Sequence, residues 1–225
     1  MDAECCTTTG FDRVKQAAWN SKKAAYVVRK GYEYNANTVD VQSQGRVAKT
    51  TSCIAIAECL ASQGRRMLVV DADHQCAASE LLVGEERLNS CEEHGRTLHD
   101  LMGAMLKPEF VQRRVPGYVV DSVSNIGGGI AGLDLIPDSM RIDDIQSRVH
   151  TYENDYEKDG YKKLADYGRT QIRRFLVQNY DYTFIDCPPS VPAQVKLPLQ
   201  LSDGFIVPCV PGRLSVRGRN GCSSA

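Results

Sequence analysis

Short apolar runs alternate with amphipathic stretches along the middle of this chain. From Thr50, the segment TSCIAIAECLASQG has apolar residues at helical spacing and ends at Gly64, a residue suited to a helix C-terminus. The next segment, RRMLVVDAD, holds a continuous apolar run that ends in two carboxylates. This pattern is typical of a buried parallel strand whose carboxyl end faces a site. A helix followed closely by a strand predicts half of a βαβ unit.

Three more short apolar runs predict strands later in the chain. They are LDLIP (133–137), YTFIDCPPS (182–190) and DGFIVPCVP (203–211). The segment YGRTQIRRFLVQNYDY, which leads into the second run, has a helical pattern. Strands that alternate with helices predict an α/β fold with a mostly parallel sheet covered on both faces.

The N-terminal part has a different character. Residues 1–38 are polar, and their basic, Ala-rich segment 11–32 predicts a helix that ends before NAN (35–37). The six Lys and Arg residues of this segment favour a solvated helix face over a nucleic-acid-binding arm. We therefore expect an N-terminal extension over residues 1–38 and one folded domain over residues 39–225.

Composition narrows the class of protein. With 225 residues and 42% hydrophobic content, one domain is favoured over two. The formal net charge of -1 gives no global positive field for nucleic acid. The nine cysteines are scattered without a C-x-x-C pair, which argues against a disulfide framework or a zinc site. The apolar runs are shorter than the roughly 18 residues that span a bilayer, and no secretory signal is recognisable, so a cytoplasmic protein is expected.

A glycine-rich stretch imitates a nucleotide-binding fingerprint. Gly127, Gly129 and Gly132 satisfy G-x-G-x-x-G, but the sequence runs from them into a predicted strand instead of a helix. The stretch is therefore predicted to be a surface loop.

Three separated motifs share the order of a known family. Lys49-Thr50-Thr51 opens the first helix, VVDADHQCAAS closes the following strand, and YDYTFIDCPPS ends a later one. Together with SDGFIVPCVP, they resemble the ParA/MinD (Soj-like) family of deviant Walker A P-loop ATPases, over about residues 39–218. The resemblance implies a three-layer P-loop NTPase fold, which in this chain is expected to be shortened at its C-terminus.

The resemblance implies a role for individual residues. Lys49 would contact the terminal phosphates of ATP, and Asp73 would position the attacking water, so these two are the candidate catalytic residues. Thr50 and Asp186 would hold Mg²⁺, which retains several of its own waters in proteins. Further nucleotide contacts are expected from the loop and flanking positions, which are Gly45, Arg46, Val47, Ala48, Lys49, Thr50, Thr51, Gln75 and Pro211.

Asp71 is expected to stabilise the loop or the outer shell of the metal. A helix start also offers unpaired N–H groups and a positive dipole end to phosphate, independently of any family.

The opening loop departs from the family pattern K-G-G-x-G-K-T-T. Gln44 stands at the signature lysine, and Arg46 and Ala48 stand at glycines. Arg46 either replaces the missing cation, since its guanidinium binds phosphate in a bidentate manner, or obstructs a turn that needs glycine. The preceding segment NTVDVQSQ (37–44) places Asp40 in an otherwise apolar strand, where an unpaired carboxylate is costly.

The resemblance also implies partners and leaves rivals open. An ATP-dependent homodimer and a ParB-like partner protein are expected, whereas non-specific DNA binding has weak support, because Arg213, Arg217 and Arg219 form only a small basic cluster. Membrane association is not expected. The first hypothesis is a partitioning ATPase for plasmids or chromosomes. The second is a relative that no longer hydrolyses ATP and acts as a nucleotide-sensing or protein-binding module. The third is an amidotransferase-like or dethiobiotin-synthetase-like enzyme on the same scaffold.

Overall fold

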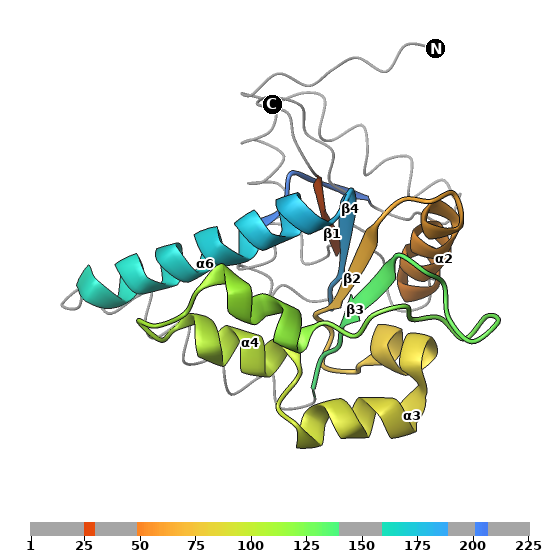
Figure 1. The fold of residues 1–225 in the computed structure, drawn as a ribbon, viewed down its shortest axis with the longest axis horizontal. Helices are drawn as coiled ribbons and strands as arrows, with labels where there is room; N and C mark the ends of the chain where they lie inside the picture. The colour runs from red at the N-terminus through yellow and green to blue at the C-terminus, as the bar shows by residue number, and fades with distance from the viewer. Residues whose placement is uncertain (1–24, 30–48, 140–158, 189–200, 207–225) are drawn as a thin grey trace, which may run out of the picture.

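A computed structural model of the chain describes residues 25–29, 49–139, 159–188 and 201–206. Five strands form one sheet in the order β3-β2-β4-β1-β5 (Figure 1). Their bounds are Ala25–Arg29 for β1, Met67–Asp71 for β2, Leu133–Ile136 for β3, Tyr182–Asp186 for β4 and Gly204–Ile206 for β5. All four strands predicted between residues 67 and 211 are therefore present, each within its predicted segment.

The sheet is mostly parallel. β2 pairs in parallel with both β3 and β4, while β1 pairs antiparallel with β4 and with β5. Four of the five strands consequently run in one direction and β1 alone opposes them. The α/β class and the mostly parallel sheet predicted from the sequence are confirmed.

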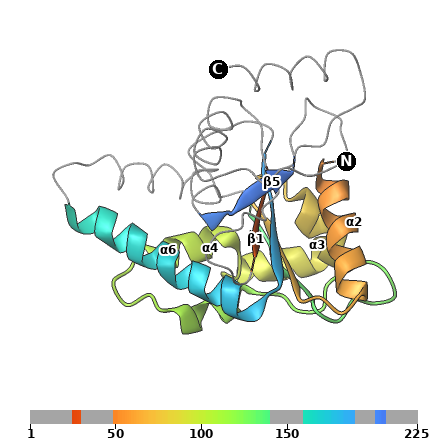
Figure 2. The ribbon, with the colours of Figure 1, turned by 90° about the horizontal axis from the view of Figure 1, so that it is seen from above.

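Helices cover both faces of this sheet (Figures 1 and 2). One face carries α2 (Lys49–Ser62) and α3 (Ala77–Glu93), and the other carries α4 (Leu98–Met105), the 3₁₀ segment η1 (Gln112–Tyr118) and α6 (Asp159–Asn179). Successive residues of β2 alternate between the two cores, as the period of a strand requires: Met67 and Val69 pack with α2 and α3, and Leu68 and Val70 with α4 and α6. The three-layer arrangement follows from strands that are apolar on both faces.

Gly64 terminates α2, as predicted from the sequence. Gly64 adopts φ +82° and donates to the Ala61 carbonyl at 2.8 Å, and Arg65 N–H donates to the Leu60 carbonyl at 3.1 Å. These two bonds form a Schellman motif. The motif turns the chain directly into β2, which is how the start of α2 and the end of β2 come to the same edge of the sheet.

The N-terminal helix prediction is wrong where the structure describes it. Ala25–Arg29, the segment AYVVR, forms strand β1 between β4 and β5. Tyr and two Val residues favour a strand, and the partners on either side satisfy its backbone. The remainder of segment 11–32 and the strand expected at 37–44 lie outside the described residues.

The glycine-rich stretch is a loop, as predicted. Gly127, Gly128, Gly129 and Gly132 all have positive φ, and the chain enters β3 at Leu133. Gly129 cannot be replaced freely, because a Cβ there would lie 2.2 Å from the Ser122 carbonyl oxygen. Among the described residues, no helix combines the length and the apolar character needed to cross a membrane.

Candidate functional site

The candidate site lies at the carboxyl edge of the sheet, where three segments converge. β2 ends at Asp71 and β4 ends at Asp186, and these two residues are partners in the parallel register. α2 begins at Lys49 and packs against both strands. Residues more than a hundred positions apart are thereby brought together at one edge.

Lys49 is the cation at the centre of this site. Its Nζ lies 3.4 Å from Asp73 Oδ2 and 3.3 Å from Asp186 Oδ1, and it also donates a hydrogen bond to the Cys187 carbonyl. The side chain of Lys49 is only 13% exposed. Burial alone would lower the pKa of Lys49, but the Asp186 and Asp73 carboxylates outweigh it and the pKa is raised. Lys49 therefore holds a full positive charge among buried carboxylates.

Thr50 is the second residue of α2 and binds the same carboxylate. Its Oγ1 donates to Asp186 Oδ2 at 2.6 Å, a short bond to a charged acceptor. Burial raises the pKa of Asp186, while Lys49 and the Thr50 hydroxyl oppose that shift. The ionised form of Asp186 is thus unfavourable at this buried position unless a cation lies beside it.

Asp71 is fully buried and is held by three donors. Its Oδ1 accepts the Asp73 N–H at 3.2 Å, and its Oδ2 accepts both the N–H and the Oγ–H of Ser79 at 2.8 Å. Burial and the neighbouring Asp186 charge raise the pKa of Asp71 to about 7, and the bonds from Ser79 and Asp73 act against the shift. A cation beside Asp71 and Asp186 would therefore stabilise the ionised form of both carboxylates.

Asp73 begins a tight turn that leads into α3. Its Oδ1 accepts the Gln75 N–H at 3.1 Å and lies 3.5 Å from His74 Nδ1, while its carbonyl accepts the Cys76 N–H at 2.7 Å. Cys76 has a left-handed conformation with φ +52°. The turn places the Asp73 carboxylate next to Lys49 and leaves the Gln75 side chain exposed.

The structure therefore brings together Lys49, Thr50, Asp73 and Asp186, the four residues predicted for catalysis and for the metal. Thr51 is exposed in the first turn of α2, and Gln75 lies on the adjacent turn. Gly45, Arg46, Val47 and Ala48, together with Pro211, lie outside the described residues, as does Gln44.

The donor set fits a hard divalent cation and a phosphate. Asp186 Oδ1 is buried and has no hydrogen bond of good geometry, while Thr50 Oγ1 donates to the other oxygen of the same carboxylate. No cluster of three or more His, Cys, Asp or Glu residues suited to a metal occurs in the described parts of the chain. Mg²⁺ in phosphate-binding sites uses few protein ligands and takes the rest from water and phosphate, so this sparse set suits it.

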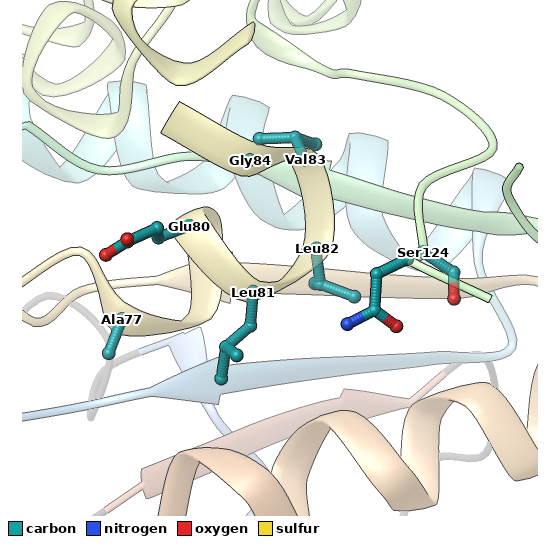
Figure 3. Close-up of a pocket in the computed structure, with 8 residues that line it drawn as sticks. Ala77, Glu80, Leu81, Leu82, Val83, Gly84 and Ser124 are labelled. Atoms are coloured by element: carbon teal, nitrogen blue, oxygen red, sulfur yellow. The ribbon is translucent and has the colours of Figure 1, made fainter. Parts of the chain in front are cut away.

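A separate pocket lies beside α3 (Figure 3). It is lined by residues of the first half of that helix and by the loop before β3: Ala77, Glu80, Leu81, Leu82, Val83, Gly84, Ser124 and Asn125. Neither Lys49 nor the carboxylates of the candidate site belong to this lining.

Sequence reasoning missed Ser79, which donates two hydrogen bonds to Asp71. The available signal was a Ser placed in the first turn of the helix that follows D-x-D. It also missed α4, although Thr97 and Asp100 form a capping box at its start.

Known proteins resemble this chain in sequence. The AAA domain family matches residues 38–222. The chain is similar to the chromosome-partitioning ATPase Soj of Treponema pallidum, with 32% identity over 153 residues, which cover 68% of this chain and 48% of that protein. The chain spans about half the length of the curated relatives it matches.

Solved structures resemble it in fold. A plasmid partition protein from Borrelia burgdorferi has a TM-score of 0.51 at 20% identity, covering 80% of this chain and 67% of that chain. Cobyrinic acid a,c-diamide synthase from Mycobacterium smegmatis, solved with a bound ATP analog and magnesium, has a TM-score of 0.53 at 22% identity, covering 81% and 65%. At these identities the likeness shows the fold alone, and that fold serves both a partition protein and a synthase.

Proposed function

Because the chain belongs to the AAA domain family, and within it to the ParA/MinD-type P-loop ATPases, we propose that it binds Mg-ATP and hydrolyses it slowly as a dimerisation switch in plasmid or chromosome partitioning. The observation that supports this most directly is the cluster of Lys49, Thr50, Asp73 and Asp186 at one edge of the sheet. These residues come from three segments and place a cation, a hydroxyl group and two carboxylates beside one another.

Each residue has a distinct part in the proposed chemistry. Lys49 exchanges its carboxylate partners for the terminal phosphates, where it offsets negative charge. Thr50 and Asp186 hold Mg²⁺, which supplies further charge neutralisation on the phosphates when it is bound. Asp73 orients the attacking water from the turn before α3, and the α2 N-terminus adds its N–H groups. Gly45, Arg46, Val47, Ala48, Thr51, Gln75 and Pro211 complete the nucleotide contacts in this proposal.

Calorimetry of the purified chain with Mg-ATP tests the proposal. We expect saturable binding that Lys49→Ala abolishes and that EDTA weakens. Lys107→Ala, which removes an exposed lysine after α4, is the matched control and should bind as the wild type does. Thr50→Ala is a second variant within the candidate site, and it keeps Lys49. We expect its ATP binding to lose much of its dependence on magnesium. No binding at millimolar ATP would overturn the proposal.

Turnover decides between the first and second functions. The substitutions Gln44, Arg46 and Ala48 favour the alternative of a nucleotide-sensing module that does not hydrolyse ATP. If the wild type releases phosphate and Asp73→Ala binds ATP without turnover, the chain is an ATPase. If both bind ATP equally and neither turns over, the alternative holds. Turnover that depends on an added small carboxylate would instead favour a ligase on the same scaffold.

The partners follow from the same proposal. We expect an ATP-dependent homodimer, stimulation of hydrolysis by a ParB-like protein, and action in the cytoplasm. Light scattering with and without Mg-ATP measures the dimer directly, and a mass that stays monomeric at saturating ATP contradicts this part of the proposal. Any non-specific DNA binding is expected to be weak and to fall steeply with salt.

A further inference from the structure

Ser79 connects three segments at the edge of the sheet that holds the site. Its N–H and Oγ–H both donate to Asp71 Oδ2 at 2.8 Å, and its Oγ accepts the Asp138 N–H at 3.1 Å. The hydroxyl thus links the end of β2, the first turn of α3 and the segment after β3. Ser79 and Asp71 are both fully buried.

The orientation of α3 explains why Ser79 is so placed. Its neighbours Glu80 and Leu81 are exposed and line the pocket beside the helix (Figure 3), while Ser79 is turned toward the sheet. A buried carboxylate needs donors, and those of Asp71 are the Asp73 N–H together with the N–H and hydroxyl of Ser79. The hydroxyl of Ser79 supplies a donor that the helix backbone alone does not.

The turn that contains Asp73 is anchored on Asp71 at both ends. At its start, the Asp73 N–H donates to Asp71 Oδ1, and after its end, Ser79 donates to Oδ2. The position of the Asp71 carboxylate therefore fixes where the Asp73 backbone begins the turn. Because Asp73 Oδ1 also accepts the Gln75 N–H, the side chain of Asp73 moves with that backbone.

We propose that Ser79 is a positioning residue for hydrolysis: through Asp71, its hydroxyl holds the Asp73 turn in the geometry that Asp73 needs to orient the attacking water. This inference rests on the proposed ATPase function. Ser79 acts at a distance from the nucleotide, so its removal leaves the contacts of Lys49 and Thr50 with ATP intact. Turnover and binding should consequently respond differently to its substitution.

Ser79→Ala, Ser79→Thr and a control variant test this role. We expect Ser79→Ala to lower kcat about ten- to hundredfold, the rate equivalent of one hydrogen bond to a charged group, and to leave the Kd of Mg-ATP within about threefold. Ser79→Thr keeps the hydroxyl and should restore kcat; Ser79→Cys keeps the volume with a weaker donor and should be intermediate. Tyr180→Phe removes a hydroxyl that donates to Asp134 at 2.9 Å near the opposite ends of the strands, and should leave kcat unchanged.

A second measurement needs no nucleotide. In the free protein, Ser79→Ala should speed hydrogen exchange of the Asp73 amide by about tenfold, whereas Tyr180→Phe should not. If the wild type shows no turnover, the ATPase proposal fails by itself, and exchange at Asp73 still decides whether Ser79 holds the turn. A Ser79→Ala protein with wild-type kcat and wild-type exchange, or an equal loss of kcat in Tyr180→Phe, would overturn the inference.

Discussion

Replacement of Lys49 by Met should destabilise the nucleotide-free protein in a way that depends on pH. Lys49 Nζ lies 3.3 Å from Asp186 Oδ1 and 3.4 Å from Asp73 Oδ2, and the two carboxylate side chains are only 0% and 7% exposed. Removal of one partner from a buried ion pair costs about 3–5 kcal/mol, because the other charge is left uncompensated. Met keeps most of the side-chain volume, so the loss reports on charge more than on packing.

Protonation of Asp186 limits this cost at low pH. Burial already raises the pKa of Asp186, and the loss of Lys49 raises it further, so the native variant retains a proton that the unfolded chain has released. The stability of the variant therefore falls as the pH rises from about 4 toward the raised pKa. With an unfolded carboxyl pKa of about 3.9, keeping Asp186 protonated in the native variant costs about 2 kcal/mol at pH 5.5. At pH 8 the same protonation would cost more than the roughly 3–5 kcal/mol of leaving Asp186 ionised and unpaired.

Urea unfolding followed by circular dichroism at pH 5.5 and pH 8 measures the difference. We expect the deficit relative to the wild type to be smaller at pH 5.5, where Asp186 can retain a proton, than at pH 8, where it reaches about 3–5 kcal/mol. The wild-type Lys49 stays charged over this range, because its own pKa is raised. Lys107→Met, at an exposed position, should change stability by less than about 0.5 kcal/mol. A Lys49→Met protein as stable as the wild type at pH 8, or a deficit that is the same at both pH values, would refute this reasoning.

Three further predictions concern stability and are measured by thermal or urea unfolding. Thr97→Ala removes the capping box of α4 and should cost about 1 kcal/mol, while Thr97→Ser should cost less; equal losses would show that the hydroxyl is not the cause. Gly64→Ala should cost about 1 kcal/mol, since only its φ of +82° opposes a side chain. Gly129→Ala should cost more, because the new Cβ would lie 2.2 Å from the Ser122 carbonyl oxygen. A larger loss for Gly64→Ala than for Gly129→Ala would contradict the loop geometry. Phe110→Ala should cost about 3–5 kcal/mol, as the ring is fully buried, and a loss below about 1 kcal/mol would mean that its core collapses without a cavity.

Much of the sheet could be predicted from the sequence because its strands are apolar on both faces. MLVV, LDLI and YTFID each stand between polar segments, and each is too short for a helix of ordinary length. Gly64 marked the end of α2 for an equally local reason, since only a residue tolerant of positive φ can close a Schellman motif. The glycine-rich loop was also predictable, because the elements around it were in the wrong order for a nucleotide fingerprint.

The prediction for residues 25–29 failed because AYVVR is locally ambiguous. A short apolar segment next to basic, Ala-rich residues suits a helix or a strand, and only hydrogen bonds to β4 and β5 settle the choice. Those partners lie about 155 and 180 residues further along the chain. No local pattern could have revealed them.

The sequence by itself determined the residue types of the candidate site and their order along the chain: a Lys-Thr pair opening a helix, D-x-D after one strand and an Asp ending another. Only the tertiary structure decided that Lys49 contacts both Asp73 and Asp186, and that Ser79 supports Asp71. The physical reason is that a strand pattern fixes which residues end a strand, whereas register and helix packing fix which of those ends meet. Burial of the place where these strand ends meet strengthens the interactions between the charged groups, and burial depends on the whole fold.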